Sequence, residues 1–527
     1  MKRRALLGAV GAGGLGLGAG ALLPGCAPKP GIVGGFIGTS PERGHKLRHD
    51  RPVAAPGTTR RTRVLIAGGG VSGLAAARAL RLRGIDDFRM LELEDAAGGN
   101  SRGGTVGGIA CPLGAHYLPV PGDDAREVQD LLEELGLRRR VAGRWTYDER
   151  HLCHSPQERL FLEGEWQEGL LPVQGVGAGA LAQYRRFAQL VDAASRAARF
   201  TIPAARAPMT ALHARLDALT FDAWLGKQGL DDPHLRWYLG YCCRDDYGAG
   251  LDQVSAWAGI HYFASRHGFS APGSGVLDDG GEPGSVLTWP EGNGWLAQRL
   301  ASPLGERLLP GRVVTRIATG RHGVEVDAFD TTRQSTERWQ AEHCIVALPV
   351  FVAARVVQDA PAFLREAAAR VRYAAWAVAN IHIREPLHDR PGAPPSWDNV
   401  IYGSQGLGYV DAMHQSLRPE PGPTVLTCYR ALGGSPQARR ELLDLPWAHW
   451  RDLLLAELAV PHPDIADKAT RIDITRYGHA MAIPVPGRLQ PATLAAGSLQ
   501  FAHSDWAGYS IFEEAFTFGH QAGMRLR

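Results

Sequence analysis

Lysine is scarce in this sequence. Only five lysines occur among 57 basic residues, and the formal net charge of the 527-residue chain is +3. No run of basic residues is interleaved with aromatic residues, as nucleic-acid binding would require. The composition therefore excludes the nucleic-acid-binding class. It leaves a folded globular chain that is too long for one hydrophobic core and is expected to form about two domains.

Long apolar runs are also lacking. The apolar stretch at residues 5–23 has only 19 residues, and seven of them are glycine. A membrane-spanning helix needs about 20 mostly apolar residues, and each interior glycine costs roughly 1 kcal/mol of helix stability. The stretch therefore predicts a cleaved signal segment, with a retained signal anchor as the alternative.

Two arginines precede this stretch and a cysteine follows it. Arg3 and Arg4, followed by an apolar run, resemble a twin-arginine (Tat) export signal. The residues from Leu23 to Cys26 resemble a bacterial lipobox, whose cysteine takes the lipid and becomes the first residue. The resemblance implies export by the Tat machinery to a bacterial cell envelope. It also implies a membrane anchor through the lipid on Cys26, on the periplasmic or outer side.

Cysteine is rare as well, with six cysteines besides Cys26. An even number in an exported chain permits disulfides but does not demonstrate them. Cys242 and Cys243 are neighbours in the sequence and could not pair with each other without strain. We expect most of these cysteines to be reduced, buried thiols, and the sequence predicts no metal site.

A glycine-rich turn follows a short β-branched strand. The strand is expected over residues 64–67, the turn carries Gly68, Gly70 and Gly73, and an Ala/Leu-rich helix follows over residues 71–83. In this spacing the first glycine permits a tight turn and the second lets a pyrophosphate approach the backbone. The third lets helix and strand pack closely. The helix N-terminal amides would then face the phosphates.

A second strand is expected over residues 88–91 and ends at Glu92. This carboxylate lies 24 residues after Gly68, where it can accept a hydrogen bond from a ribose hydroxyl. Strand, turn, helix and acidic residue thus stand in the order of a dinucleotide-binding unit. The sequence predicts an adenine dinucleotide site, with a glycine-rich turn that binds no ligand as the alternative.

The residues after Glu92 indicate which dinucleotide is bound. They lead to the pair Gly98-Gly99, and this order resembles the start of the flavin-containing amine oxidase superfamily, which also holds protoporphyrinogen oxidases and phytoene desaturases. The resemblance implies FAD as the cofactor and runs from Arg63 to Gly523. Further stretches resemble family motifs in family order, namely residues 111–117, 288–301, 311–317, 343–349 and 499–523.

The resemblance also implies roles for individual residues. The backbone at Gly114 would lie beside the flavin ring, and the backbone of Val314 would hold the adenine. Asp505 would lie near the ribityl chain and the pyrophosphate. The amides of Ile511 and Phe512, at the start of a helix, would face the flavin pyrimidine.

The glycine-rich motifs depart from the family pattern at several positions. Ala96 and Asn100 stand where the family usually has arginines, and Arg102, two residues further on, is the predicted substitute at the pyrophosphate. In the last motif Glu514 replaces a glycine, which places a carboxylate near the start of a helix.

Two residue types that act on the flavin in relatives are missing at the expected positions. No cysteine lies between His503 and Phe512, so the FAD is expected to be bound non-covalently. Many amine oxidases place a lysine near the flavin, and none occurs over residues 378–382, where it should fall. A dehydrogenase that passes electrons to an acceptor other than oxygen therefore becomes an alternative to an oxidase.

The segments between the FAD motifs are expected to build the substrate domain. Residues 126–136 have the apolar spacing of an amphipathic helix, Thr220 is a predicted helix N-cap, and residues 375–383 resemble a strand. Residues 235–268 are dense in aromatic and charged side chains. They predict a core helix whose Arg244, Asp245 and Asp246 form ion pairs, or else a pocket wall containing Asp246 and Tyr247.

Few side chains are required for the reaction itself, because a flavin takes a hydride equivalent and the protein supplies orientation, a dry pocket and a base. His116 and its neighbour Tyr117 adjoin the backbone expected beside the flavin, and His116 is a candidate base. His479 lies in a stretch that resembles the strand crossing above the flavin in the family. Trp506 and Tyr509 are candidates for an aromatic wall. Satisfied polar contacts and core packing are the structural alternatives.

These patterns predict an α/β fold in which a doubly wound, Rossmann-like FAD-binding domain of the amine-oxidase type carries an inserted α+β substrate domain. The expected boundaries are a signal peptide with lipobox at 1–26, a tether at 27–60, FAD-binding segments at 61–122, 285–355 and 471–527, and substrate-domain segments at 123–284 and 356–470.

The predicted function is that of an FAD-dependent oxidoreductase that oxidises a C–N bond of a small-molecule amine by hydride transfer to flavin N5. A flavin-dependent C–C desaturase or an enzyme like protoporphyrinogen oxidase is the first alternative. A non-catalytic flavoprotein binding module is the second.

Overall fold

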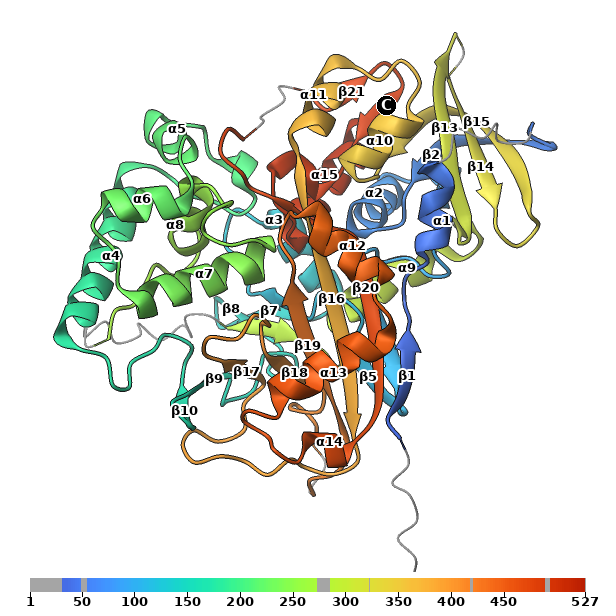
Figure 1. Cartoon of the computed structure of the whole chain (residues 1–527). Helices are drawn as coiled ribbons and strands as arrows, with labels where there is room; N and C mark the ends of the chain where they lie inside the picture. Colours follow the sequence, from blue (N-terminus) through green and yellow to red (C-terminus); the bar gives the residue numbers. More distant parts are fainter. Residues whose placement is uncertain are drawn as a thin grey trace, which may run out of the picture.

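The structure is a computed structural model and describes residues 31–48, 55–272, 285–321, 323–417, 420–488 and 493–526. Two mixed sheets organise these residues, with helices on their faces (Figure 1). We call them the FAD sheet and the substrate sheet after the two domains that the sequence predicts. The predicted export signal, with Arg3, Arg4 and Cys26, lies outside the described residues.

The FAD sheet has the strand order β12-β3-β2-β15-β14-β13. Its β2 pairs in parallel with β3 and β15, whereas β13, β14 and β15 form an antiparallel meander. The strands are β2 (Thr58–Ala67), β3 (Phe88–Leu91), β12 (Leu308–Leu309), β13 (Arg312–Gly320), β14 (Gly323–Asp330) and β15 (Ser335–Val346), with β22 (Leu499–Phe501) beside β15 and β21 (Ala495–Ala496) beside β22.

Helices cover both faces of the FAD sheet. Val64 and Ile66 of β2 pack into one buried cluster with α2 (Val71–Leu82), α3 (Arg126–Glu134), α9 (Gly294–Ala301) and α15 (Phe512–Arg525). Leu65 and Ala67 point to the opposite face, where α10 (Val350–Val356) and α11 (Ala362–Arg370) pack. Because side chains alternate along a strand, burial of both faces explains the unbroken apolar run at 64–67.

The substrate sheet has the order β1-β20-β16-β19-β18-β17-β9-β10. Its central pairs are antiparallel, whereas β1 lies parallel to β20 and β17 lies parallel to β9. The strands are β1 (Val33–Phe36), β9 (Glu158–Leu162), β10 (Glu165–Glu168), β16 (Arg372–Ile383), β17 (Asp398–Ile401), β18 (Tyr409–Asp411), β19 (Thr424–Ala431) and β20 (Ala469–Ile483).

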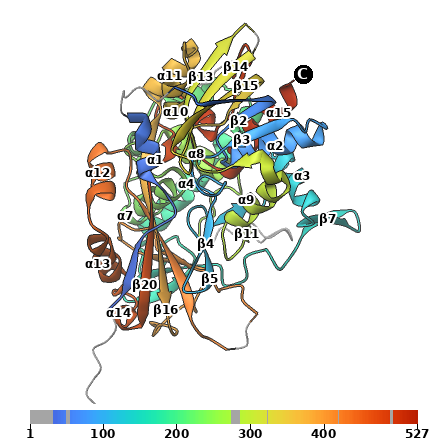
Figure 2. The ribbon, with the colours of Figure 1, turned by 90° about the vertical axis from the view of Figure 1, so that its right-hand side faces the viewer.

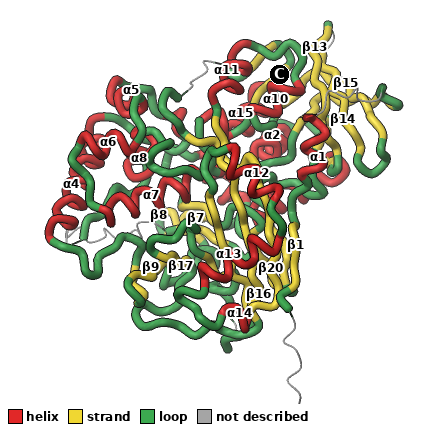
Figure 3. Tube along the Cα trace, viewed as in Figure 1, coloured by secondary structure: helices red, strands yellow, loops and turns green. Residues whose placement is uncertain are grey.

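One face of the substrate sheet packs against the helices α4 to α8, which gather on one side of the molecule (Figure 3). Trp376 and Val378 of β16 point to this face, and Ala377 and Ala379 point to the other, against α12 and α13. These helices are α4 (Ala178–Ala197), α5 (Ala211–Asp217), α6 (Phe221–Lys227), α7 (Pro233–Tyr247), α8 (Ala256–Ala264), α12 (Pro436–Asp444) and α13 (Trp447–Leu458).

Short elements complete the described chain. The remaining helices are α1 (Pro41–His45) and α14 (Ile465–Lys468), with 3-10 turns at Lys46–Arg48, Ala204–Arg206, Ser302–Arg307 and Ser504–Ala507. Paired short strands are β4 (Gly103–Val106) with β5 (Ile109–Pro112), β6 (Tyr117–Pro119) with β11 (Val286–Thr288), and β7 (Arg138–Val141) with β8 (Arg144–Tyr147). No helix among the described residues is long and apolar enough to cross a membrane.

Several local predictions are confirmed. The predicted amphipathic helix is α3, which buries Val128, Leu131 and Leu132. Thr220 caps α6 by accepting a hydrogen bond from the Ala223 amide at 3.2 Å. The strand expected over 375–383 lies within β16. The six cysteines in the described residues are all free thiols, and only Cys153 is not fully buried.

The segment predicted as a tether is partly folded onto the body. Residues 33–36 form β1 at the edge of the substrate sheet, and α1 follows at residues 41–45 (Figure 2). Residues 58–60 already belong to β2. The composition of this segment indicates a linker, but strand pairing with the distant β20 orders residues 33–36.

Candidate functional site

A cavity of about 870 Å³ lies where the two sheets meet. It is lined by both sheets, by the turn after β2 and by the starts of α2 and α15. Most residues predicted from the sequence line this one cavity: Gly68, Gly70, Glu92, Gly98, Gly99, Gly114, His116, Tyr117, Val314, His479, Asp505, Ile511 and Phe512.

The glycines form a cradle that only glycine can build. Gly68 and Gly98 have φ angles of +104° and +131°, which other residues rarely adopt. A Cβ atom on Gly68 would lie 2.3 Å from the carbonyl oxygen of Ala347. At Gly70, in contrast, the nearest atom to an added Cβ is the Cα of Gly99 at 3.9 Å, so this backbone is open to the cavity. The cradle therefore leaves room for a bulky anionic group beside the turn.

Two helix N-termini are directed at the same cavity. Val71 and Ser72 of α2 line it, as do Ile511 and Phe512 at the start of α15. Free amides and the helix dipole at an N-terminus favour negative charge. The arrangement fits a dinucleotide whose pyrophosphate lies at α2 and whose second ring system reaches α15.

Glu92 is held in place by backbone amides. Its carboxylate accepts hydrogen bonds from Gly69 and Glu94, both at 2.8 Å. Burial raises the pKa of Glu92 above its ordinary value, although the two amides oppose this shift. Glu92 lines the cavity, so its remaining lone pairs are consistent with the predicted contact to a ribose hydroxyl.

Asp505 is anchored from three sides. It accepts hydrogen bonds from the Tyr373 hydroxyl at 2.5 Å and the Val350 amide at 2.9 Å, and it lies 3.1 Å from His503 Nδ1. Burial alone would raise the pKa of Asp505, but these partners outweigh burial and lower it. Asp505 is therefore a fixed negative charge in the wall of the cavity. His479 lies close by, stacked on Phe351 with ring centroids 4.4 Å apart.

The segment from Gly114 to Tyr117 is fastened by tyrosines of the substrate sheet. Tyr429 donates a hydrogen bond to the Gly114 carbonyl at 3.1 Å, and Tyr477 donates one to the Leu113 carbonyl at 2.8 Å. The His116 ring stacks on Tyr429 with centroids 4.3 Å apart. Burial lowers the pKa of His116 to about 3, so its imidazole is neutral near pH 7.

One end of the cavity is acidic. Asp245 and Asp246, near the end of α7, line it together with Glu513 of α15. Both oxygens of Asp246 lie 3.1 Å from the Arg266 guanidinium. Asp245 accepts a hydrogen bond from Tyr117 at 3.4 Å. Burial and the neighbouring Asp246 raise the pKa of Asp245 to about 7, and burial raises that of Glu513 to about 7.

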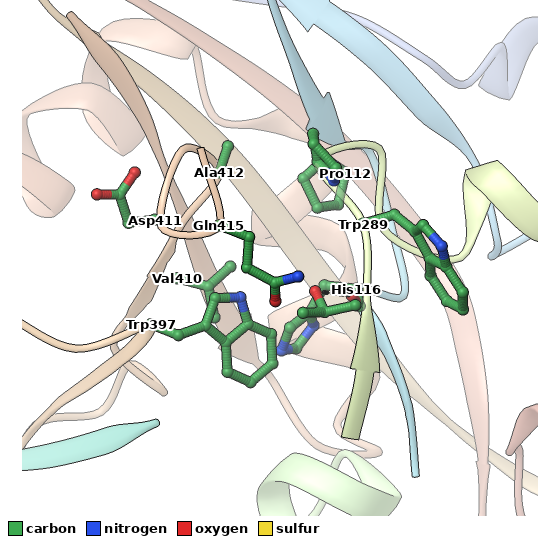
Figure 4. A pocket seen from close by; sticks show the side chains of 10 residues that line it. Pro112, His116, Trp289, Trp397, Val410, Asp411, Ala412 and Gln415 are labelled. Carbon is green, nitrogen blue, oxygen red and sulfur yellow. Dashed lines mark hydrogen bonds between the residues drawn. The ribbon is translucent and has the colours of Figure 1, made fainter. Parts of the chain in front are cut away.

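A second, much smaller chamber lies behind His116. It has a volume of about 20 Å³, room for one water molecule, and His116 lines both spaces. Figure 4 shows the Gln415 amide beside His116 and Trp397 in this chamber. Two of the lining residues, Gln415 and Trp289, have a buried side-chain atom, Oε1 and Nε1 respectively, without a hydrogen-bond partner among the described residues.

Three predicted residues do not line the cavity. Gly73 packs α2 onto the turn, since an added Cβ would lie 2.0 Å from the Gly68 carbonyl oxygen. Arg102 donates a hydrogen bond to the Gly38 carbonyl instead of facing the cavity, so the predicted pyrophosphate contact is corrected. Trp506 is buried against Phe363 and Phe501, so the predicted catalytic wall at this position is wrong.

Two aromatic residues proposed for the pocket wall are core residues instead. Tyr509 is fully buried and donates a hydrogen bond to Glu514 at 2.7 Å. Tyr247 is also buried and donates to the Ala258 carbonyl at 3.0 Å. Their hydroxyl groups are thus satisfied within the core, in agreement with the packing alternatives stated for both residues.

The sequence missed several residues that the structure places in the wall. Trp376, Tyr429 and Tyr477 line the cavity from the substrate sheet, and Asp245 and Glu513 line its acidic end. The two carboxylates stand in stretches that the motifs had singled out. The three aromatic residues carry no local signal, because alternation along a strand does not say which face meets a cavity.

These features define a class of protein: one that binds a dinucleotide in a glycine cradle, beside two helix N-termini that open into a single large cavity. Residues 71–523 match the family of flavin-containing amine oxidoreductases, and because the match covers most of the chain, the chain belongs to this family. It is an FAD-dependent oxidoreductase.

One relative shares part of the sequence, and several solved structures share the fold. The chain is 30% identical over 147 residues to an L-amino acid dehydrogenase from Synechocystis sp., a match that spans 28% of each chain. Its fold is similar to that of putrescine oxidase bound to putrescine, with a TM-score of 0.65 at 18% identity, and to that of cyclohexylamine oxidase from Brevibacterium oxydans, with a TM-score of 0.61 at 18% identity. Each alignment covers 88% of this chain and 98% of the other.

Proposed function

We propose that this enzyme oxidises the C–N bond of a cationic amine. The observation that supports this proposal best is the acidic end of the cavity, where Asp245, Asp246 and Glu513 face one guanidinium, Arg266. Carboxylates in a poorly solvated wall attract an ammonium group strongly, because charge interactions strengthen as the effective dielectric falls.

Aromatic side chains complete this environment. Tyr117, Trp376, Tyr429 and Tyr477 line the same cavity. Aromatic faces attract cations and exclude water, so they favour an alkyl ammonium over a neutral or anionic ligand. The flavin, when bound, supplies the capacity to accept a hydride equivalent. The residues of the chain bind the ammonium group, orient the C–N bond and keep the site dry.

The pairing of Arg266 favours an amine over an amino acid. A substrate carboxylate at the acidic end would need a cation there, and the Arg266 guanidinium already makes a two-point contact with Asp246. Displacing it would leave Asp246 buried without its partner, which is costly. An amine without a carboxylate leaves the Arg266–Asp246 pair intact, and its ammonium group would bind to Asp245.

The electron acceptor in this proposal is a molecule other than oxygen. The lysine that many amine oxidases place near the flavin has no counterpart among the described residues, where Val378 of β16 lines the cavity and no lysine does. In the part of the chain that the structure describes, no cysteine lines the cavity, which supports non-covalent binding of FAD. His116 is a candidate acceptor for a substrate proton, although its low pKa makes it a weak base.

Export as a folded lipoprotein is part of the proposal. The FAD site joins residues as distant as Gly68 and Asp505, so the cofactor has to be captured while the chain folds. FAD is made in the cytoplasm, and a pathway that threads unfolded chains would discard it. Export through Arg3 and Arg4 by the Tat machinery, followed by lipidation at Cys26, would deliver a loaded enzyme to the cell envelope.

Anaerobic reduction of the flavin tests the function directly. Purified holoprotein is mixed with a diamine, a monoamine or an L-amino acid, and the flavin absorbance is followed. We expect the amines to bleach it and Asp245→Asn to slow this reaction, whereas the exposed control Asp252→Asn does not. Bleaching by amino acids alone, or only by a substrate with an oxidisable C–C bond, would overturn the proposal.

A further inference from the structure

The N-terminal segment from Gly38 to Leu47, here called the strap, crosses from the substrate sheet to the FAD sheet. Figure 2 shows β1 running beside β20 and leading up to α1. The strap follows β1 and contains α1. None of the family motifs that pointed to FAD includes it, since the resemblance begins at Arg63 and the family match at residue 71.

One end of the strap is fixed to the substrate sheet. The Ile37 amide donates to the Ile474 carbonyl at 2.9 Å, and the Thr39 hydroxyl donates to the Arg476 carbonyl at 2.9 Å. Gly38 has a φ angle of +83°, and a Cβ at this position would lie 2.9 Å from Thr475 Oγ1. The strap therefore leaves the sheet through a turn that requires glycine.

The other end is fixed to the loop that follows the ribose-binding candidate Glu92. The Ser40 amide donates to Glu94 Oε1 at 2.8 Å. Arg43 donates to the Leu93 carbonyl at 3.1 Å and pairs with Asp95 at 2.7 Å. These contacts fasten the strap to the part of the FAD sheet where a dinucleotide's adenosine is expected.

The strap also forms part of the cavity wall. Its lining residues are Thr39, Ser40, Pro41, Gly44, His45 and Leu47, in the same cavity as Glu92 and Val314. Leu47 packs against the buried cluster that contains Val314. From its anchors and its lining we propose that the strap closes the adenosine end of the FAD site and retains the adenosine diphosphate part of the cofactor.

This arrangement explains how a non-covalent cofactor could stay bound. The dinucleotide cannot leave past the strap unless Ser40 and Arg43 release the loop after Glu92. Binding should order the strap, and the ordered strap should slow release. The retention is set by contacts outside the substrate space, so the inference does not depend on which substrate the enzyme oxidises.

Limited proteolysis with separate cofactor fragments tests the closure. FAD-free full-length protein is digested with trypsin, and cleavage after Arg43 and Lys46 is followed by mass spectrometry with ADP, with FMN or with neither. We expect ADP to slow cleavage in the strap about tenfold or more, and FMN to have little effect. Cleavage after the exposed Arg140, on the β7–β8 hairpin, is the internal control and should not change. Equal cleavage of the strap with and without ADP would overturn the proposal.

Variants test retention in the loaded protein. Arg43→Ala removes two contacts of the strap, and Gly38→Val forces its turn open. We expect FAD release, measured by recovery of flavin fluorescence after dilution, to accelerate roughly tenfold, which corresponds to about 1.4 kcal/mol. Gly35→Ala is the matched control, since an added Cβ there meets nothing within 4 Å.

The outcome is separable from that of the proposed function. If both strap variants release FAD at the wild-type rate, the strap does not retain the cofactor, whatever the substrate. If they release it faster but are still bleached by amines when FAD is in excess, the strap acts in retention alone. A variant that binds ADP with wild-type affinity and yet loses flavin reduction would also contradict a role confined to the adenosine end.

Discussion

Replacement of Asp245 by asparagine tests whether the acidic end of the cavity recognises the substrate ammonium. The pKa of this carboxyl is raised from 3.8 to about 7 by burial and by Asp246. About a tenth of it is therefore ionised at pH 6 and about nine tenths at pH 8. If the ionised form binds the amine, kcat/KM should rise roughly ninefold between these pH values, because kcat/KM reports the free enzyme.

The Asp245→Asn variant should lose the inflection in the pH dependence of kcat/KM and most of the affinity for the amine. Truncating one partner of a buried charge pair costs at least about 2 kcal/mol, which is roughly thirtyfold in kcat/KM at pH 8. The assay is the initial rate of flavin-linked amine oxidation with an artificial electron acceptor at saturating FAD. Asp252→Asn serves as the control. A variant that keeps the wild-type kcat/KM and its pH dependence would refute the assignment of Asp245.

Protein stability gives an independent check with a defined sign. A carboxyl whose pKa is raised on folding contributes stability that is complete below pH 3.8 and is lost as the pH rises through about 7. With a shift of about three pKa units the loss is at most about 4 kcal/mol. Asp245→Asn removes this loss. The unfolding temperature of the variant minus that of the wild type should therefore be larger at pH 8 than at pH 5. A difference that does not change with pH would contradict the raised pKa.

Four further predictions follow from the cavity and the sequence. Tyr117→Phe removes a hydrogen bond that lowers the pKa of Asp245, so the inflection in kcat/KM should move to higher pH, and an unmoved inflection would argue against the contact. Gly70→Asp places a carboxylate in the open space beside Gly99 where the pyrophosphate is expected, so the purified variant should lack flavin absorbance; full flavin content would disprove the site. Trp506→Phe should lower the unfolding temperature without changing substrate kinetics, since this side chain packs in the core, and a changed KM would place it in the cavity after all. Replacing both Arg3 and Arg4 by lysine preserves charge but not the guanidinium pair, so a flavin-loaded, unlipidated precursor should accumulate inside the cell; fractionation that finds FAD-loaded protein in the envelope would count against folded export.

Local sequence patterns determined the parts of the fold that depend on neighbouring residues. The apolar run at residues 64–67, the glycine spacing and the helix behind it predicted β2, its turn and α2 because both faces of that strand are buried and only glycine fits the turn. Thr220 marked the start of α6, since a capping side chain acts within three residues. The order of the motifs along the chain predicted the FAD-binding fold, because each motif is a short local pattern of this kind.

Only the tertiary structure decided which side chains face the cavity. Asp245 meets Tyr117 across 128 positions, and the Thr39 hydroxyl meets the Arg476 carbonyl across 437 positions. The sequence predicts that Arg102 contacts a phosphate, but in the fold its guanidinium donates a hydrogen bond to the Gly38 carbonyl. The ring of Trp506 packs against Phe501 in the core. Contacts between residues so far apart depend on how complete sheets and helices pack, and no spacing within a short stretch of chain encodes them.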